Sequence, residues 1–209
     1  LLNVAKVNAG ETVVVSAASG AVGQVVGQLA RIKGAYVIGI AGGPVKCTYC
    51  VEELGFDACI DYKANRFVDN LKQAAIHGID IYFENVGGDV LEAVIPLLNP
   101  GARVPICGFI AHYNLTRAER RPTPLERLKS AGLSILDKEG NREGFRFFGF
   151  SELAAQHPDA ENALREISQW IKEGQLKYRE SVTTGLESCV PAFIGMLSGE
   201  NFGKTIVRF

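Results

Sequence analysis

The sequence has almost no net charge and no long hydrophobic run. Its 209 residues contain 22 Lys and Arg against 23 Asp and Glu, a formal net charge of −1. This balance provides neither a basic surface for nucleic acid nor a charged block for a membrane partner. No apolar run approaches the roughly 18 residues of a membrane-spanning helix, and the first residues lack the order of a secretory signal. We therefore expect a soluble, cytoplasmic protein without nucleic-acid or membrane partners.

Cysteine and histidine are too few and too scattered to indicate a disulfide framework or a metal site. The five cysteines are an odd number, and Cys59, Cys107 and Cys189 lie in apolar segments that are typical of buried free thiols. Cys47 and Cys50 form a C-x-x-C pair, but no second pair and no nearby histidine accompanies them. We predict no metal site and place this pair on adjacent turns of one helix.

Several catalytic signatures are also missing. The sequence contains no Tyr-x-x-x-Lys pair of short-chain reductases, no G-x-S-x-G elbow and no G-x-x-x-x-G-K-[ST] phosphate loop. If the chain is part of an enzyme, a bound cofactor is therefore expected to supply the reactive group.

Short β-rich runs alternate with helical runs in the first half of the chain. Strands are predicted at residues 12–17, 35–41, 57–62, 79–86 and 102–109, with helices at 21–33, 45–54, 66–76 and 89–98. Because the strands are apolar on both faces, the pattern is typical of βαβ units with helices on each side of a parallel sheet. We predict a Rossmann-type α/β fold with a doubly wound parallel sheet, which binds ligands at the carboxyl ends of its strands.

The alternation stops after residue 109. Residues 110–130 are polar, basic and proline-bearing, which indicates a long connection, and a strand at 143–150 and a helix at 158–172 follow. From residue 175 the sequence predicts a strand, a helix and a strand. We therefore divide the chain into a dinucleotide-binding domain, residues 1–174, and a C-terminal segment, residues 175–209.

The stretch from Ala18 to Gly23 matches a dinucleotide-binding fingerprint in which alanine replaces the first glycine. It follows an apolar strand and opens an amphipathic helix, as the G-x-G-x-x-G motif requires. Gly20 would let the backbone approach a pyrophosphate, and Gly23 would let the helix pack closely on the sheet, with the phosphates at the helix N-terminus. A tight turn without a ligand is the alternative.

The end of the second predicted strand distinguishes between dinucleotides. An NAD site usually has an Asp or Glu there that binds the ribose 2′-hydroxyl. Here the chain has Ala41, Gly42 and Gly43, followed by Lys46. A glycine bend leaves room for a 2′-phosphate and the lysine supplies a countercharge. The sequence therefore favours NADP over NAD, and the missing acid also argues against S-adenosylmethionine methyltransferases.

Two further segments end at the same edge of the predicted sheet. "YFENVGG" places Asn85 at the end of the fourth strand, either at the cofactor or as a turn former before the glycines. "PICGFI" places Cys107 and Gly108 at the end of the fifth strand. We expect Cys107 to be a buried small residue whose backbone approaches the cofactor, and not a nucleophile.

With these segments in place, the sequence resembles the medium-chain dehydrogenase/reductase superfamily, in its zinc-independent branch of NADPH-dependent alkenal, prostaglandin and curcumin reductases. The resemblance covers essentially the whole chain and rests on "AGETVVVSAASGAVG", "GIAGGPVK", "GFDACIDYK", "IDIYFENVGG", "ICGFIAHYN" and "AFIGMLSGENFGKTIVRF". It implies that a GroES-like, β-rich catalytic domain precedes this chain, which is then a fragment. Residues 175–209 would return to complete that domain.

The resemblance also implies cofactor contacts along the whole crevice. At the pyrophosphate and the adenosine these are Gly20, Ala21, Val22, Gly23, Gly42, Lys46 and Tyr62; toward the nicotinamide they are Asn85, Cys107, Gly108, Phe109, Ile110, Tyr113, Phe145, Arg146, Phe147 and Asn201. Arg146 departs from the family, which usually has an apolar residue there.

The implied reaction is hydride transfer from NADPH to the β-carbon of an α,β-unsaturated aldehyde or ketone. Tyr113 is the one catalytic candidate in this chain, and a packing role is its alternative. An NADPH-dependent quinone oxidoreductase and a non-catalytic NADPH-binding module are the alternative functions. A homodimer formed through an apolar edge at residues 145–150 is expected as well.

Overall fold

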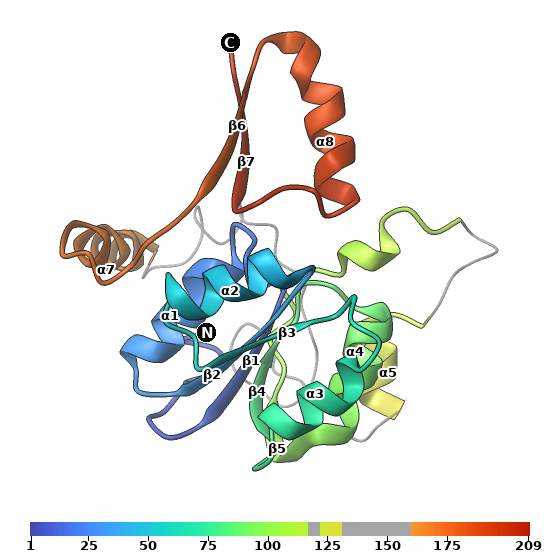
Figure 1. Ribbon diagram of the computed structural model, residues 1–209. Coiled ribbons are helices and arrows are strands. Elements are labelled where there is room, and N and C mark those ends of the chain that lie inside the picture. Colours follow the sequence, from blue (N-terminus) through green and yellow to red (C-terminus); the bar gives the residue numbers. More distant parts are fainter. Residues whose placement is uncertain (117–121, 131–159) are drawn as a thin grey trace.

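A five-stranded parallel sheet forms the centre of the computed structural model, which describes residues 1–116, 122–130 and 160–209 (Figure 1). The strand order is β3-β2-β1-β4-β5, and every pairing is parallel. The strands are β1 (Thr12–Ser16), β2 (Tyr36–Ala41), β3 (Ala58–Asp61), β4 (Ile79–Phe83) and β5 (Leu98–Arg103). The order reverses direction between β1 and β4, as in a doubly wound sheet. The predicted Rossmann-type fold is confirmed.

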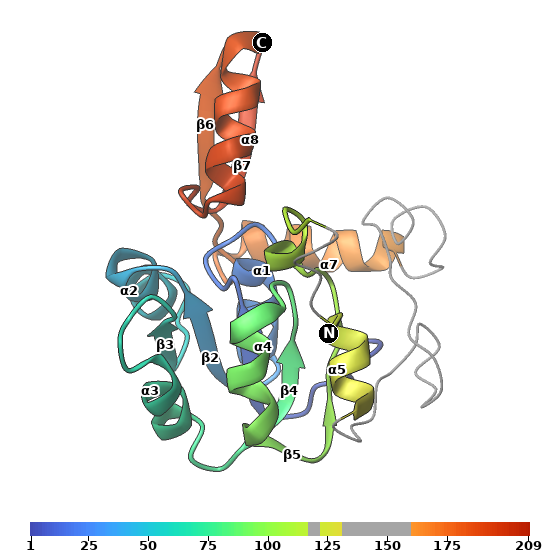
Figure 2. The same cartoon turned by 90° about the vertical axis from the view of Figure 1, so that its right-hand side faces the viewer.

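Helices cover both faces of this sheet (Figures 1 and 2). One face carries α1 (Gly23–Ile32) and α2 (Pro44–Glu52), and the other carries α3 (Phe67–Ala74), α4 (Gly88–Val94) and α5 (Pro124–Ser130). Successive valines of β1 point to opposite faces: Val13 and Val15 pack with α1 and α2, whereas Val14 packs with α3 and α4. All three are fully buried. Two buried faces explain the unbroken apolar strands of the sequence.

The fifth strand starts and ends earlier than predicted. β5 stops at Arg103, a short 3₁₀ helix (Ile95–Leu97) precedes it, and Ile106 adds an isolated bridge to Glu84. Pro105 explains the break, because proline has no N–H for the ladder. Its carbonyl still accepts a hydrogen bond from the N–H of Glu84 at 2.9 Å. The chain therefore still reaches the carboxyl edge of the sheet.

The predicted connection at residues 110–130 contains helical structure that the sequence reading missed. A 3₁₀ turn spans Ile110–His112, and α5 begins at Pro124. Thr123 and Glu126 form a capping box before it: the N–H of Thr123 donates to Glu126 Oε2 at 2.7 Å, and the N–H of Glu126 donates to Thr123 Oγ1 at 3.3 Å. The motif T-P-L-E carried this signal.

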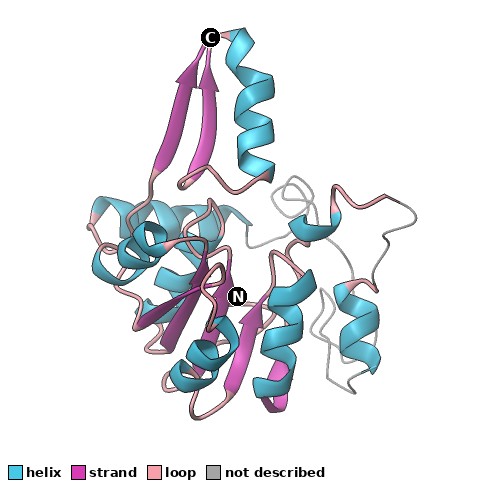
Figure 3. Ribbon diagram, turned by 45° about the vertical axis from the view of Figure 1, so that its right-hand side comes forward, coloured by secondary structure: helices cyan, strands magenta, loops and turns pink. Residues whose placement is uncertain are grey.

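The C-terminal segment forms a second unit beside the main sheet (Figure 3). After α7 (Ala160–Lys172), the strands β6 (Glu180–Thr184) and β7 (Lys204–Arg208) pair in parallel, and a 3₁₀ turn (Leu186–Ser188) and α8 (Cys189–Leu197) connect them. Phe193 of α8 is 57% exposed, and other apolar side chains of this unit are exposed as well. These apolar surfaces fit the expectation that residues 175–209 complete another domain; the boundary itself stays a prediction.

Two buried glutamines of α1 attach this unit to the Rossmann domain. The amide of Gln28 exchanges two 2.8 Å hydrogen bonds with the backbone of Lys177. Gln24 accepts from the N–H of Arg179 at 2.9 Å and donates to its carbonyl at 3.2 Å. Such pairs satisfy polar groups inside the packed region. Among the described residues, no helix is both long and apolar enough to cross a membrane.

Candidate dinucleotide-binding site

The turn after β1 has the close packing that the fingerprint predicts. A Cβ atom at Gly23 would lie 2.2 Å from the carbonyl oxygen of Ala17, so only glycine fits there. The N–H of Gly20 donates to that same oxygen at 2.9 Å and closes the turn. Ala21 and Val22 are accessible at the start of α1, whose first turn contains no acidic residue. The positive N-terminus of this ten-residue helix is therefore free of local negative charge.

The left-handed position of the turn is Ala17 and not Ala18, contrary to the reading that Ala18 replaces a turn glycine. Ala17 has φ of 49°, a conformation that costs energy in a residue with a Cβ. Ala18 is fully buried, and a Cβ at Gly39 of β2 would lie 2.9 Å from its own Cβ. The fingerprint position is therefore occupied by a side chain that packs between β1 and β2.

The bend after β2, at Gly42 and Gly43, lies close to the side chains of Tyr62 and Lys63, which follow β3. A Cβ at Gly42 would lie 2.9 Å from Tyr62 Cε1 and 3.2 Å from Lys63 Cε. Asp61 joins the two loops, because its Oδ1 accepts hydrogen bonds from the N–H of Gly43 at 2.8 Å and of Lys63 at 2.9 Å. The Asp61 carboxylate therefore interacts with backbone N–H groups. The structure brings the predicted residues Gly42 and Tyr62 together and adds Lys63.

Lys46 reaches the same bend from the first turn of α2. Its Nζ donates to the carbonyl of Gly199 at 2.6 Å, so it also contacts the C-terminal unit. Burial, and next the positive charge of Lys63, lower the pKa of Lys46. Two cations held close together repel each other, and an anion between them would relieve that repulsion. The pair therefore has the charge of a phosphate subsite.

The completely buried carboxyl group of Glu84 supports the loop after β4, and the sequence analysis did not predict it. Glu84 Oε1 accepts from the N–H groups of Val86 and Gly87 at 2.6 and 2.9 Å, and it lies 3.1 Å from both Ser16 Oγ and Tyr82 Oη. Glu84 Oε2 has no partner. Burial raises the pKa of Glu84, although the hydrogen bonds oppose the shift. The only sequence signal was a charge inside an apolar strand.

Asn85 joins the ends of β1 and β4. Its Nδ2 donates to the carbonyl of Ser16 at 2.7 Å, and its N–H donates to Ser16 Oγ at 2.8 Å. The carbonyl of Asn85 accepts from the N–H of Ile110 at 3.2 Å. Asn85 is thus held at the point where the strand order reverses, which is where ligands bind in such sheets.

Cys107 is exposed, which corrects the expectation of a buried residue. The break at Pro105 turns the chain outward, and the N–H groups of Cys107 and Gly108 both donate to the carbonyl of Glu84, at 2.8 and 3.1 Å. Partial desolvation raises the pKa of the Cys107 thiol. A raised pKa disfavours the thiolate, and the statement that Cys107 is not a nucleophile stays a prediction.

Tyr113 lies beside Asn85 and Gly108. A Cβ at Gly108 would lie 3.6 Å from Tyr113 Oη and 3.3 Å from the carbonyl oxygen of Asn85. The ring of Tyr113 packs edge-on against Phe109, with centroids 5.7 Å apart, and its side chain is 54% exposed. The structure therefore gathers Asn85, Gly108, Phe109, Ile110 and Tyr113 at one end of the crevice.

Asn201 approaches the turn from the C-terminal unit. Its Nδ2 donates to the carbonyl of Gly203 at 3.0 Å, and the N–H of Gly203 donates to the carbonyl of Ser19 at 3.0 Å. A β-bridge between Gly20 and Gly203 fixes this contact. The predicted residues Phe145, Arg146 and Phe147, and the proposed dimer edge, lie outside the described residues.

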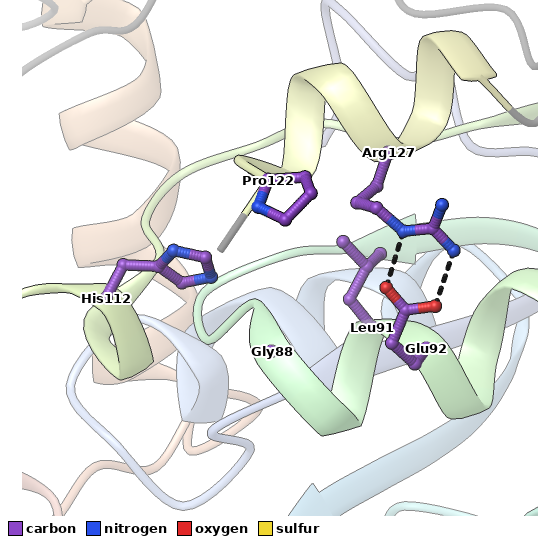
Figure 4. Close-up of a pocket in the computed structure, with 6 residues that line it drawn as sticks. All are labelled: Gly88, Leu91, Glu92, His112, Pro122 and Arg127. Atoms are coloured by element: carbon purple, nitrogen blue, oxygen red, sulfur yellow. Dashed lines mark hydrogen bonds and ion pairs between the residues drawn. The ribbon is translucent and has the colours of Figure 1, made fainter. Parts of the chain in front are cut away.

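A cavity of about 260 Å³ lies next to this end of the crevice (Figure 4). Arg127 on α5 makes two 2.6 Å hydrogen bonds to the carboxylate of Glu92 on α4, and His112 lies across from this pair. The Arg127 guanidinium lowers the pKa of Glu92. Because the two charges neutralise each other, the described residues that line the cavity provide no unpaired cation for a phosphate. None of its lining residues is among the predicted cofactor contacts; they are Gly88, Leu91, Glu92, His112, Pro122 and Arg127.

Residues 21–148 match the family described as zinc-binding dehydrogenase, which is more than half of the chain. The chain belongs to this family. The NADPH-dependent curcumin reductase of Escherichia coli is 45% identical over 100% of the chain and 58% of its own length. Prostaglandin reductase 1 of Bos taurus is 41% identical over 100% of the chain and 60% of its own length. The branch predicted from the sequence is confirmed.

A solved structure of this dehydrogenase family agrees with the fold. CurA of Vibrio vulnificus in complex with NADPH is 43% identical, with a TM-score of 0.85 over 99% of this chain and 59% of its own. The chain thus spans less than two thirds of the length of these relatives. The matched part of these dehydrogenases contains the Rossmann sheet and the C-terminal unit.

The family's description names zinc, but the described part of the chain contains no cluster of zinc ligands. No group of three or more His, Cys, Asp or Glu side chains in residues 1–116, 122–130 and 160–209 could hold a metal ion. The Gly20–Gly23 turn, the Gly42 bend and the two lysines fit a dinucleotide instead.

Proposed function

We propose that the protein containing this chain is an NADPH-dependent oxidoreductase that reduces the carbon–carbon double bond of α,β-unsaturated aldehydes or ketones. The choice of NADPH as the cofactor rests on the pair of lysines, Lys46 and Lys63, beside a bend where glycine replaces the carboxylate of an NAD site. The relatives named as curcumin and prostaglandin reductases support the substrate class. A small molecule is thus the proposed partner.

NADPH supplies the hydride when it is bound, and the residues of this chain bind and orient it. The α1 N-terminus and the Gly20–Gly23 turn would hold the pyrophosphate, and Lys46 with Lys63 would hold the 2′-phosphate. Asn85 and the residues around Gly108 would border the nicotinamide. Hydride addition to the β-carbon leaves negative charge on the carbonyl oxygen, so a nearby donor would stabilise the enolate until it is protonated.

Tyr113 is the proposed donor, and replacing it with phenylalanine tests this role. We expect kcat to fall about two- to tenfold, the effect of one lost hydrogen bond, with KM for NADPH unchanged. Steady-state kinetics with a saturating enone measure it. Tyr36→Phe is the matched control. Tyr36 is 43% exposed and is the first residue of β2, so it lies at the amino end of the parallel strands, whereas the candidate site lies at their carboxyl ends. An unchanged kcat would assign Tyr113 to packing against Phe109.

Turnover of the full-length protein separates the proposed reaction from its two alternatives. We expect NADPH oxidation with an enone, formation of the saturated carbonyl product, and slower oxidation with a quinone. Faster turnover of the quinone would favour a quinone oxidoreductase. NADPH binding without turnover of either compound would indicate a non-catalytic module.

A further inference from the structure

The C-terminal end of α8 lies against the bend at which Lys46 is placed. α8 points this end toward the Rossmann domain (Figure 1). The Lys46 ammonium donates to the carbonyl of Gly199, just beyond α8, at 2.6 Å. A Cβ atom at Gly199 would lie 3.8 Å from Tyr62 Oη, on the other side of the same bend. The proposed 2′-phosphate subsite is therefore bordered by the C-terminal unit as well as by the Rossmann domain.

The way in which α8 ends fixes the backbone of Gly199. Gly199 has φ of 74°, and its N–H donates to the carbonyl of Met196 at 3.2 Å. The N–H of Glu200 donates to the carbonyl of Gly195 at 2.8 Å. A left-handed glycine of this kind commonly follows a helix. The direction of the Gly199 carbonyl is therefore set by a conformation that glycine adopts easily and most other residues resist.

This contact gives Lys46 a fixed position and gives α8 a cation. The last turn of α8 has no basic residue, so the partly negative end of this helix is complemented by a lysine of α2 instead. Fixing a flexible lysine side chain costs conformational entropy, and an acceptor that already holds the ammonium reduces this cost when a ligand binds. The ammonium has three N–H donors, so the bond to Gly199 leaves two for a phosphate.

We propose that the carbonyl of Gly199 positions Lys46 for the 2′-phosphate, and that the preference for NADPH over NADH therefore depends on the C-terminal end of α8. Gly199 is a positioning residue, because it acts through Lys46. NADH has no 2′-phosphate, so its binding does not use this arrangement. The inference rests on the proposed function for the identity of the cofactor.

Substitution of Gly199 tests this role, because the position has room for a side chain but requires a left-handed backbone. Among the described residues outside its immediate neighbours, none comes closer than 3.8 Å to an added Cβ. Valine strongly resists a positive φ, whereas asparagine adopts it more readily than most residues with a side chain. Gly199→Val should therefore turn the carbonyl away from Lys46, and Gly199→Asn should keep it in place.

Calorimetric titration of the full-length protein with NADPH and with NADH measures the effect. We expect Gly199→Val to weaken NADPH binding about five- to tenfold and to leave NADH binding unchanged, whereas Gly199→Asn should bind both as the wild type does. In a Lys46→Ala background, Gly199→Val should not weaken NADPH binding further, because the group that it positions is gone. If the valine variant does not fold, Gly199→Ala strains the backbone less and should weaken NADPH binding about two- to fivefold.

Gly174→Val is the matched control, because Gly174 repeats the same backbone at the end of α7. It has φ of 71°, and its N–H donates to the carbonyl of Ile171 at 3.1 Å. The N–H of Gln175 donates to the carbonyl of Trp170 at 2.9 Å. This variant should lose a similar amount of stability as Gly199→Val and leave the affinities for both dinucleotides unchanged.

Three results would overturn the proposal. The first is an equal loss, or no loss, of NADPH and NADH affinity in Gly199→Val. The second is a loss of NADPH affinity in Gly199→Asn as large as that in Gly199→Val, and the third is a loss that persists in full in the Lys46→Ala background. A wild-type protein that binds NADPH no better than NADH would instead refute the proposed cofactor, and this comparison is made before any variant is measured.

Discussion

Replacing Lys46 and Lys63 together with alanine is expected to weaken NADPH binding by about 100-fold, while NADH binding stays unchanged. A hydrogen bond to a charged group contributes about 1.5–3 kcal/mol, or roughly ten- to 100-fold in affinity. Lys46 is partly buried and should account for most of this loss, and the exposed Lys63 should account for less because solvent screens it. Calorimetric titration of each single variant and of the double variant measures these contributions.

NADH is the internal control for this prediction, because it lacks the 2′-phosphate. Lys46 also donates to the carbonyl of Gly199, so a general structural defect would weaken the binding of both dinucleotides. Lys72→Ala removes an exposed lysine from α3 and should change neither affinity. Equal losses for NADPH and NADH in the double variant would refute the assignment of the lysines to the 2′-phosphate.

Glu84→Ala is expected to lower the free energy of unfolding by about 3–5 kcal/mol, because it leaves several buried donors without an acceptor. These donors are the Tyr82 hydroxyl and the N–H groups of Val86 and Gly87, which all bind Oε1. Glu92→Ala is the matched control. It removes an exposed carboxylate that pairs with Arg127 and should cost about 1 kcal/mol or less.

Glu84→Gln should behave differently, because glutamine keeps the accepting oxygen but cannot ionise. The pKa of Glu84 is raised in the folded state, so above pH 4.5 the unfolded state releases this proton more readily than the folded state. The stability of the wild type relative to Glu84→Gln should therefore fall as the pH rises from 4.5 through the folded pKa. Denaturant unfolding at several pH values between 4.5 and 8 measures the difference. A constant difference would contradict a raised pKa.

The sheet and its helices were predictable because the strands are apolar on both faces and the turns carry glycines. The pattern located β1 to β4 closely, and it failed at β5, which begins at Leu98 and ends at Arg103, before Pro105, whereas the prediction was 102–109. α5 lies within the predicted connection and was not predicted, although the sequence contains its capping box, T-P-L-E. The local periodicity of the sequence was thus sufficient for the regular elements but not for their interruptions.

The candidate site was predictable where backbone geometry imposes glycine and where a residue follows the end of a strand, as Lys46 and Asn85 do. Gly20, Gly23 and Gly42 lie where a side chain would meet other atoms. Lys63 and Glu84 could not be found in this way, because each depends on contacts between separate loops. The exposure of Cys107 likewise follows from a turn that an apolar segment does not reveal.

The most direct test of the central claim is calorimetric titration of the full-length protein with NADPH and with NADH at the same ionic strength. A site built around Lys46, Lys63 and the Gly42 bend predicts that NADPH binds about 100-fold more tightly than NADH. Equal affinities for the two dinucleotides, or tighter binding of NADH, would contradict this account of the site.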